Sequence, residues 1–109
     1  MLPVQIRHYL TRRGSDPFQE WLDGLSDLKA RDGVLRRLNR LLAGNPGNHH
    51  YCRGGVWELC IDLGPGYRVY YGMPGRDVVL LLGAGQKRTQ NRDIAEAIRR
   101  WADYNRSDG

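Results

Sequence analysis

Hydrophobic and polar residues alternate over residues 4–10, and this pattern predicts a strand with one buried face. The apolar positions then change to the helical repeat, on a stripe made of Phe18, Trp21, Leu22 and Leu25. Asp16 is expected to cap this first helix, and Pro17 suits its first position. The chain is therefore expected to begin with a strand that leads into a helix.

A second helix is predicted from about Leu28 to Ala43, where apolar residues again follow the helical repeat. The residues expected to face inward are Val34, Leu35, Leu38, Leu41 and Leu42. The other side carries Arg31, Arg36, Arg37 and Arg40. This row of arginines could contact RNA, although a solvated helix face is the more common explanation of such a pattern.

Residues 44–55 show no periodicity and are predicted to form a loop. Three short strands are predicted after it, over residues 56–62, 67–72 and 77–83. Because the turns between them are short, these strands are expected to pair as antiparallel neighbours. A last helix is predicted after residue 91, with a buried stripe made of Ile94, Ala97, Ile98 and Trp101.

Together these elements predict the order β-α-α-β-β-β-α in a single α+β domain over residues 1–109. The sheet should be mainly antiparallel, with the helices packed on one face. Side chains alternate between the two faces along each strand. The set expected to face the helices is Trp57, Leu59, Ile61, Tyr67, Val69 and Tyr71. The opposite set, expected on a face without helices, is Glu58, Cys60, Asp62, Arg68 and Tyr70.

Two explanations of that open face are compatible with the sequence. In the first, Tyr70 stacks on an RNA base while Arg68 binds the adjacent phosphate. In the second, Arg68 forms a cross-strand ion pair with Glu58 or Asp62, and Tyr70 is an ordinary surface residue.

The charge of the chain favours a polyanionic partner. The formal net charge is +5, with 17 Lys and Arg against 12 Asp and Glu, and nucleic acid is the commonest such partner. Arginine supplies nearly all of the positive charge, since Lys29 and Lys87 are the only lysines. Arginine can grip a phosphate at two points. Arg53 and Lys87 could reach the same patch as Arg68, and three converging cations there would bind a phosphate.

The sequence makes several classes of protein improbable, among them membrane-spanning and secreted proteins. No apolar run approaches the roughly 20 residues that span a bilayer, and the polar N-terminal segment does not resemble a signal peptide. A cytoplasmic protein without a membrane partner is therefore expected.

Cys52 and Cys60 are too few for a disulfide framework. With His49 and His50 they also lack the spacing of a zinc site, so no metal is expected.

Four stretches resemble the RelE/ParE superfamily of toxins from type II toxin–antitoxin systems: DPFQEWLDGL, GGVWELCIDLGPGYRVYYG, VLLLGAGQKRTQ and RDIAEAIRRWADY. The similarity is greatest to the phage-derived, HigB-like addiction module killer proteins, and it covers about residues 4–104. The resemblance implies an endoribonuclease that cuts mRNA in the ribosomal A site, without a metal or a small-molecule cofactor. It also implies a cognate helix-turn-helix antitoxin as partner. ParE-like members of the superfamily instead poison DNA gyrase.

Carried over residue by residue, the resemblance implies that Arg68 holds the scissile phosphate and that Lys87 is the basic residue after the last strand. The 2′-hydroxyl of the RNA is expected to attack the phosphorus and to leave a 2′,3′-cyclic phosphate. Lys87 or Arg88 would assist the leaving oxygen. Tyr70 would stack on a base or orient it, and Glu58 is a candidate general base.

Two departures from the family pattern concern this site. Cys60 stands where related toxins usually have an arginine, and Gln86 stands in place of an acid. Loss of a cation beside Arg68 is expected to weaken phosphate binding, because charge-assisted hydrogen bonds contribute about 1.5–3 kcal/mol each. A degenerate toxin that only binds its antitoxin is therefore a further alternative. His49 or His50 is another candidate base if the loop folds over the site.

Overall fold

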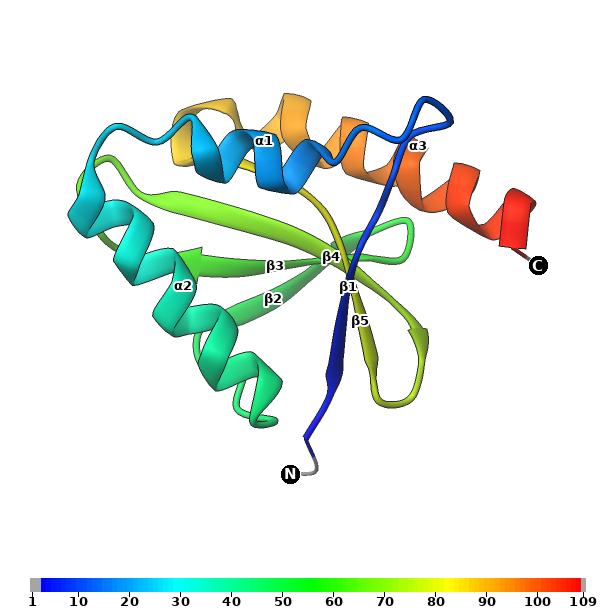
Figure 1. Cartoon of the computed structure of the whole chain (residues 1–109), viewed down its shortest axis with the longest axis horizontal. Coiled ribbons are helices and arrows are strands. Elements are labelled where there is room, and N and C mark those ends of the chain that lie inside the picture. Colours follow the sequence, from blue (N-terminus) through cyan, green and yellow to red (C-terminus); the bar gives the residue numbers. More distant parts are fainter. Residues whose placement is uncertain (1–2, 109) are drawn as a thin grey trace.

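Five strands form one mixed sheet in the computed structural model, which describes residues 3–108. The elements in chain order are β1 (Gln5–His8), α1 (Pro17–Asp23), α2 (Leu28–Leu42), β2 (His49–Arg53), β3 (Val56–Ile61), β4 (Tyr67–Gly75), β5 (Val78–Gln86), the short 3-10 helix η1 (Lys87–Thr89) and α3 (Gln90–Asp108). The strand order is β1-β5-β4-β3-β2 (Figure 1). β1 is parallel to β5, and the other neighbours are antiparallel. The α+β class and the mainly antiparallel sheet agree with the prediction.

β2 lies within the segment predicted to be a loop, so that prediction is wrong for residues 49–53. β2 pairs with β3 through a two-residue turn at Gly54 and Gly55, whose φ angles are 61° and 85°. Positive φ at both central residues is the geometry of a type I′ turn, which matches the twist of a hairpin and favours glycine. The element order is therefore β-α-α-β-β-β-β-α, with one strand more than predicted.

The helices cover both faces of the sheet, not one face as predicted, and Figure 1 shows α2 and α3 on different sides of the strands. The core beneath α1 and α2 includes Phe18, Leu22, Val34, Leu59 and Val69. The core beneath α3 includes Val56, Tyr70, Leu82, Ile94 and Ala97. The sheet face that was expected to be open is therefore the face on which α3 packs.

Side-chain directions in the central strands agree with the predicted alternation, since Leu59 and Val69 face α1 and α2 whereas Tyr70 faces α3. The prediction for α2 is wrong at Leu35 and Leu42, which are 41% and 46% exposed. The helix contacts the sheet through a narrower stripe than its apolar pattern suggests.

The start of α1 agrees with the sequence. The Asp16 side chain accepts a hydrogen bond of 3.0 Å from the backbone amide of Gln19, and Pro17 occupies the first helical position. The other carboxylate oxygen of Asp16 lies 2.7 Å from His8 Nδ1. Asp16 thereby links the start of α1 to the end of β1.

The indole of Trp101 packs directly onto the backbone of the sheet and holds α3 against it. A β-carbon added at Gly72 in β4 would overlap the six-membered ring of this indole. A β-carbon at Gly55 would overlap its five-membered ring. The close approach of α3 therefore requires glycine at both positions.

We expect Gly72→Ala to lower the free energy of unfolding by about 1–3 kcal/mol, because the new methyl group would push Trp101 and α3 away from the sheet. Gly75→Ala in the same strand is the matched control, since its β-carbon would make only an ordinary contact, 3.6 Å from Val78 Cγ2. Denaturant unfolding of the two variants measures the difference. Equal stability of the two would contradict the packing of Trp101 on Gly72.

Candidate functional site

Four polar or ionisable residues are buried side by side on the α3 face of the sheet. They are Glu58 and Cys60 of β3 and Arg68 and Tyr70 of β4, and we call them the buried polar row. The strand register pairs Cys60 with Arg68 and Glu58 with Tyr70. These four residues are neighbours on one face as predicted, but the face is covered rather than open.

Arg68 is only 8% exposed, so the prediction that it stands on a bare sheet face is wrong. Its Nη1 donates a hydrogen bond of 3.0 Å to the carbonyl of Tyr67, and its Nε has no partner within residues 3–108. In that part of the chain it forms no salt bridge with Glu58 or Asp62 either. A buried cation without a carboxylate partner is unfavourable, so a bound anion would stabilise this guanidinium.

Tyr70 is fully buried beneath α3, and its predicted role of stacking on an RNA base is therefore wrong for this structure. Its hydroxyl has no hydrogen-bond partner among the described residues. Burial, and then the negative charge of Glu58, raise the pKa of Tyr70 far above its ordinary value. Tyr70 is thus a neutral part of the core rather than a surface platform.

The carboxylate of Glu58 is held from above by α3. Gln90 Nε2, in the first turn of that helix, donates hydrogen bonds of 2.9 and 3.2 Å to its two oxygens. Cys60 Sγ lies 3.8 Å from one of them, and burial followed by the charge of Glu58 raises the pKa of the Cys60 thiol. Gln90 was not among the predicted site residues; the polar run at residues 86–91 is the only sequence signal for it.

Lys87 lies beside Arg68, at the point where β5 passes into η1. Its backbone amide donates a hydrogen bond of 2.9 Å to the carbonyl of Gly66, in the turn before β4. A β-carbon at Gly66 would lie 3.4 Å from Lys87 Cβ and 3.8 Å from Arg68 Nη1. The structure therefore brings together two predicted catalytic cations that come from different elements of the chain.

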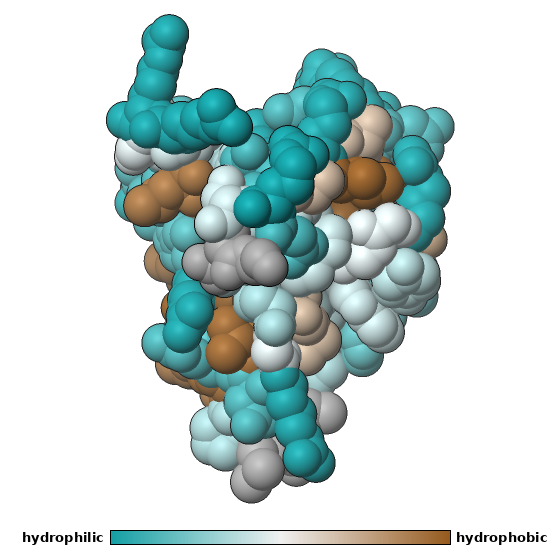
Figure 2. Space-filling model, turned by 90° about the vertical axis from the view of Figure 1, so that its right-hand side faces the viewer, coloured by the Kyte–Doolittle hydropathy of each residue, from teal (hydrophilic) through white to brown (hydrophobic). Residues whose placement is uncertain are grey.

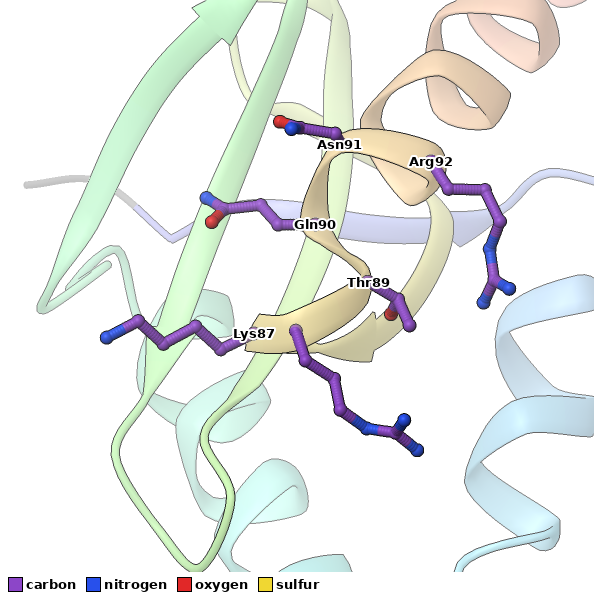
Figure 3. Close-up of a pocket in the computed structure, with 6 residues that line it drawn as sticks. Lys87, Thr89, Gln90, Asn91 and Arg92 are labelled. Atoms are coloured by element: carbon purple, nitrogen blue, oxygen red, sulfur yellow. The ribbon is translucent and has the colours of Figure 1, made fainter.

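A hollow of about 420 Å³ opens beside Lys87, and we call it the η1 hollow. Its lining residues are Lys87, Arg88, Thr89, Gln90, Asn91 and Arg92. Figure 3 shows Lys87 and Gln90 extending toward one side and Arg92 toward the other. Arg88 Nε donates a hydrogen bond of 2.8 Å to the Gln86 side chain. Lys87 links this hollow to Arg68, because both residues lie against Gly66.

Arg53 lies at the opposite end of β3 from Arg68. It pairs with Val56, whereas Cys60, four residues further along β3, pairs with Arg68. At the rise of a strand, four residues correspond to about 13 Å. The predicted convergence of Arg53 with Arg68 and Lys87 is therefore wrong.

The two neighbouring histidines of β2 face opposite sides of the sheet. His50 pairs with Glu58 and is exposed, on the side of the buried polar row. His49 lies on the other side, with its ring centroid 5.8 Å from that of Trp57. Only His50 therefore lies near the row, at its outer edge.

Other kinds of site receive no support from the described residues. Residues 3–108 contain no group of three or more His, Cys, Asp or Glu side chains that could hold a metal ion. Within the same range, the helices are too short or too polar to cross a membrane.

The face shown in Figure 2 is mainly hydrophilic, with hydrophobic residues in separate spots. A partner of this face would therefore be recognised mainly through polar and charged contacts.

These features define an α+β protein with a mixed five-stranded sheet, a buried polar row and a basic hollow at the start of its last helix. The chain belongs to the same family as a protein of Haemophilus influenzae, named "Uncharacterized protein", to which it is 38% identical over 96 residues. The matched region covers 88% of this chain and 91% of the relative. No family model matches the chain.

We expect Glu58→Gln to lower the pKa of Cys52, which burial and then the charge of Glu58 raise to about 11. The value should stay above that of a free thiol, because burial is the larger cause. The pH dependence of alkylation by iodoacetamide, measured with Cys60→Ser as background, gives this pKa. Glu20→Gln on the exposed side of α1 removes the same charge and should change nothing. An unchanged pKa in the Glu58 variant would contradict the proximity of Cys52 to the buried polar row.

Proposed function

We propose that this protein is a cytoplasmic toxin of a type II toxin–antitoxin system, with RelE-like topology, that cleaves mRNA on the ribosome. The observation that carries the proposal is the proximity of Arg68 and Lys87 at Gly66. Neither cation forms a salt bridge with a carboxylate within residues 3–108. Two neighbouring cations without a counter-ion suit one phosphate group. The net charge of +5 and the resemblance to RelE/ParE toxins support the same assignment.

In the proposed reaction, Arg68 and Lys87 hold the scissile phosphate of the RNA. The 2′-hydroxyl of the preceding nucleotide loses its proton and attacks the phosphorus, and the bond to the 5′ oxygen breaks. The products are a 2′,3′-cyclic phosphate and a 5′-hydroxyl end. Arg68 stabilises the negative charge that develops on the phosphate, and Lys87 protonates or stabilises the leaving oxygen. Arg88 is less suited to this role because its Nε is bonded to Gln86.

No residue of this site is ideally placed to accept the proton of the 2′-hydroxyl. Glu58 is buried and already accepts two hydrogen bonds from Gln90, whereas His50 is exposed on the strand beside it. His50 is therefore the better placed of the two candidates to take the proton of the 2′-hydroxyl. Positioned acid–base groups contribute about 10²–10⁴-fold, so a site this poor in them is expected to depend on the ribosome to orient the RNA.

We expect Arg68→Ala to relieve the growth arrest caused by inducing the protein without its antitoxin. Loss of one preorganised charge-stabilising group lowers the cleavage rate by about 10²–10³-fold. The fold should persist, because Arg68 pairs with no carboxylate among the described residues, and circular dichroism checks this. Arg12→Ala, in the exposed loop after β1, is the control with the same charge change.

The readout is the mapping of new 5′ ends within translated codons after induction. Undiminished toxicity of the Arg68 variant would show that the site is assigned wrongly. Cleaved DNA–gyrase complexes and a DNA-damage response, without new mRNA ends, would instead assign the protein as a ParE-like gyrase poison.

The position of Cys60 favours a second candidate function, that of a weakened toxin retained for binding its helix-turn-helix antitoxin. Cys60 is buried directly across from Arg68, where the resemblance implies a second arginine. In that case the parent protein should not arrest growth, and Cys60→Arg should create or increase mRNA cleavage. Cleavage by the parent that Cys60→Arg leaves unchanged would exclude this candidate.

A further inference from the structure

A second basic hollow, of about 260 Å³, lies between α2 and the end of β3, and we call it the α2 hollow. Its lining residues are Gly33, Arg36, Arg37, Arg40, Ile61, Asp62 and Leu63. Gly33 allows Leu63 to pack directly on the helix, because a β-carbon at Gly33 would overlap the Leu63 side chain. The hollow thus has an apolar wall beside three arginines and one carboxylate, that of Asp62, so its positive charges outnumber its negative ones.

Arg37 is the fixed member of this cluster. Its guanidinium donates hydrogen bonds of 2.8 and 3.0 Å to the carbonyls of Pro46 and Asn48, and a further one to the carbonyl of Cys60. Its Nε is buried and has no partner among the described residues. Arg37 therefore connects α2 by hydrogen bonds to the segment before β2 and to the end of β3. Its positive charge also lies in the wall of the hollow.

Arg36 and Arg40 are the other two cations of the hollow. Both side chains are exposed, and no salt bridge involves either of them in the described part of the chain. The Nη2 atoms of Arg37 and Arg40 lie 3.0 and 3.2 Å from the place of a β-carbon on Gly47, so the two guanidinium groups are neighbours. Burial, and then repulsion by Arg40, lower the pKa of Arg37. A bound anion would relieve this repulsion.

The α2 hollow and the Arg68–Lys87 pair lie on either side of one turn. Leu63, just after β3, lines the hollow, and Gly66, just before β4, contacts Lys87. The Gly66 amide donates a hydrogen bond of 2.9 Å to the Leu63 carbonyl, so the turn is closed and short. A strand of RNA that crosses this turn would meet both clusters of cations.

We propose that the α2 hollow binds a phosphate of the same RNA strand whose scissile phosphate lies at Arg68 and Lys87. This inference rests on the proposed function for the identity of the ligand, but it concerns binding and not cleavage. Arginine is suited to this role because its planar fork binds phosphate oxygens at two points. Arg36 and Arg40 make the contact, and Arg37, fixed by its bonds to the backbone carbonyls, adds its charge beside them.

The test uses a short single-stranded RNA in which every 2′-hydroxyl is methylated, so that the RNA cannot be cleaved by its own 2′ oxygen. Fluorescence anisotropy over a series of salt concentrations gives its Kd for the full chain and for two double variants. Arg36→Gln with Arg40→Gln removes the two arginines of the α2 hollow that are not fixed to the backbone. Arg12→Gln with Arg13→Gln, in the exposed loop before α1, removes the same charge elsewhere.

We expect the α2 variant to bind about tenfold more weakly or worse, since it cannot form the two charge-assisted hydrogen bonds to the phosphate. The slope of log Kd against log salt concentration should fall by about 0.7 for each phosphate that the variant no longer neutralises. The loop variant should retain the parent affinity and slope. Equal weakening in both variants would show a general charge effect and overturn the proposal, as would full affinity in the α2 variant or no RNA binding by the parent.

The outcome is independent of catalysis. If the parent cuts no mRNA in cells but the α2 variant still binds the methylated RNA more weakly than the parent, the nuclease assignment fails and the second phosphate site stands. If mRNA is cut and the α2 variant binds normally, the nuclease assignment stands and the second site is excluded.

Discussion

The packing of α3 on the second face of the sheet determines the environment of the buried polar row. Trp101 fits against the backbone at Gly72, and Gln90, in the first turn of the helix, holds the carboxylate of Glu58. Between these two anchors Tyr70 is sealed from solvent. Without this helix the central strands would present an open face of polar residues. With it, the accessible part of the site lies at the end of β5, where Lys87 begins η1.

A buried guanidinium without a carboxylate partner has a cost that the rest of the fold must offset. The cores on both sides of the sheet supply the stability for this. In return, the charge of Arg68 is held in a region of low dielectric, where its attraction for a phosphate is stronger than at an exposed position. Gly66 and Lys87 lie beside it, so the anion can be shared between a buried cation and one at the start of η1. This division suits the proposed nuclease, which must bind a phosphate and then stabilise a new charge on it.

The sequence pattern was sufficient for local structure and for side-chain direction, but not for the layer that covers each face. Because side chains alternate along a strand, Tyr70 and Leu59 must face opposite sides of the sheet, whichever helix covers each side. The apolar stripe of α3 fits either face of a sheet, so periodicity alone could not show that this helix buries Arg68 and Tyr70. β2 was missed because HHYCR is a polar edge strand, although the two glycines after it are typical of a type I′ turn. The proximity of Arg68 and Lys87 followed from strand order, whereas the separation of Arg53 required the register.

Cys60 connects the two basic regions through its backbone and its strand pairing. Its carbonyl accepts a hydrogen bond from Arg37 on the α2 side, while the residue itself pairs with Arg68 on the α3 side. The end of β3 is therefore fixed relative to both clusters of cations, and the distance between them is set by a sheet rather than by a flexible loop. An RNA strand that binds both clusters must bend to that fixed spacing. In the proposed nuclease, this arrangement would provide the positioning that a site with weak proton-transfer groups needs.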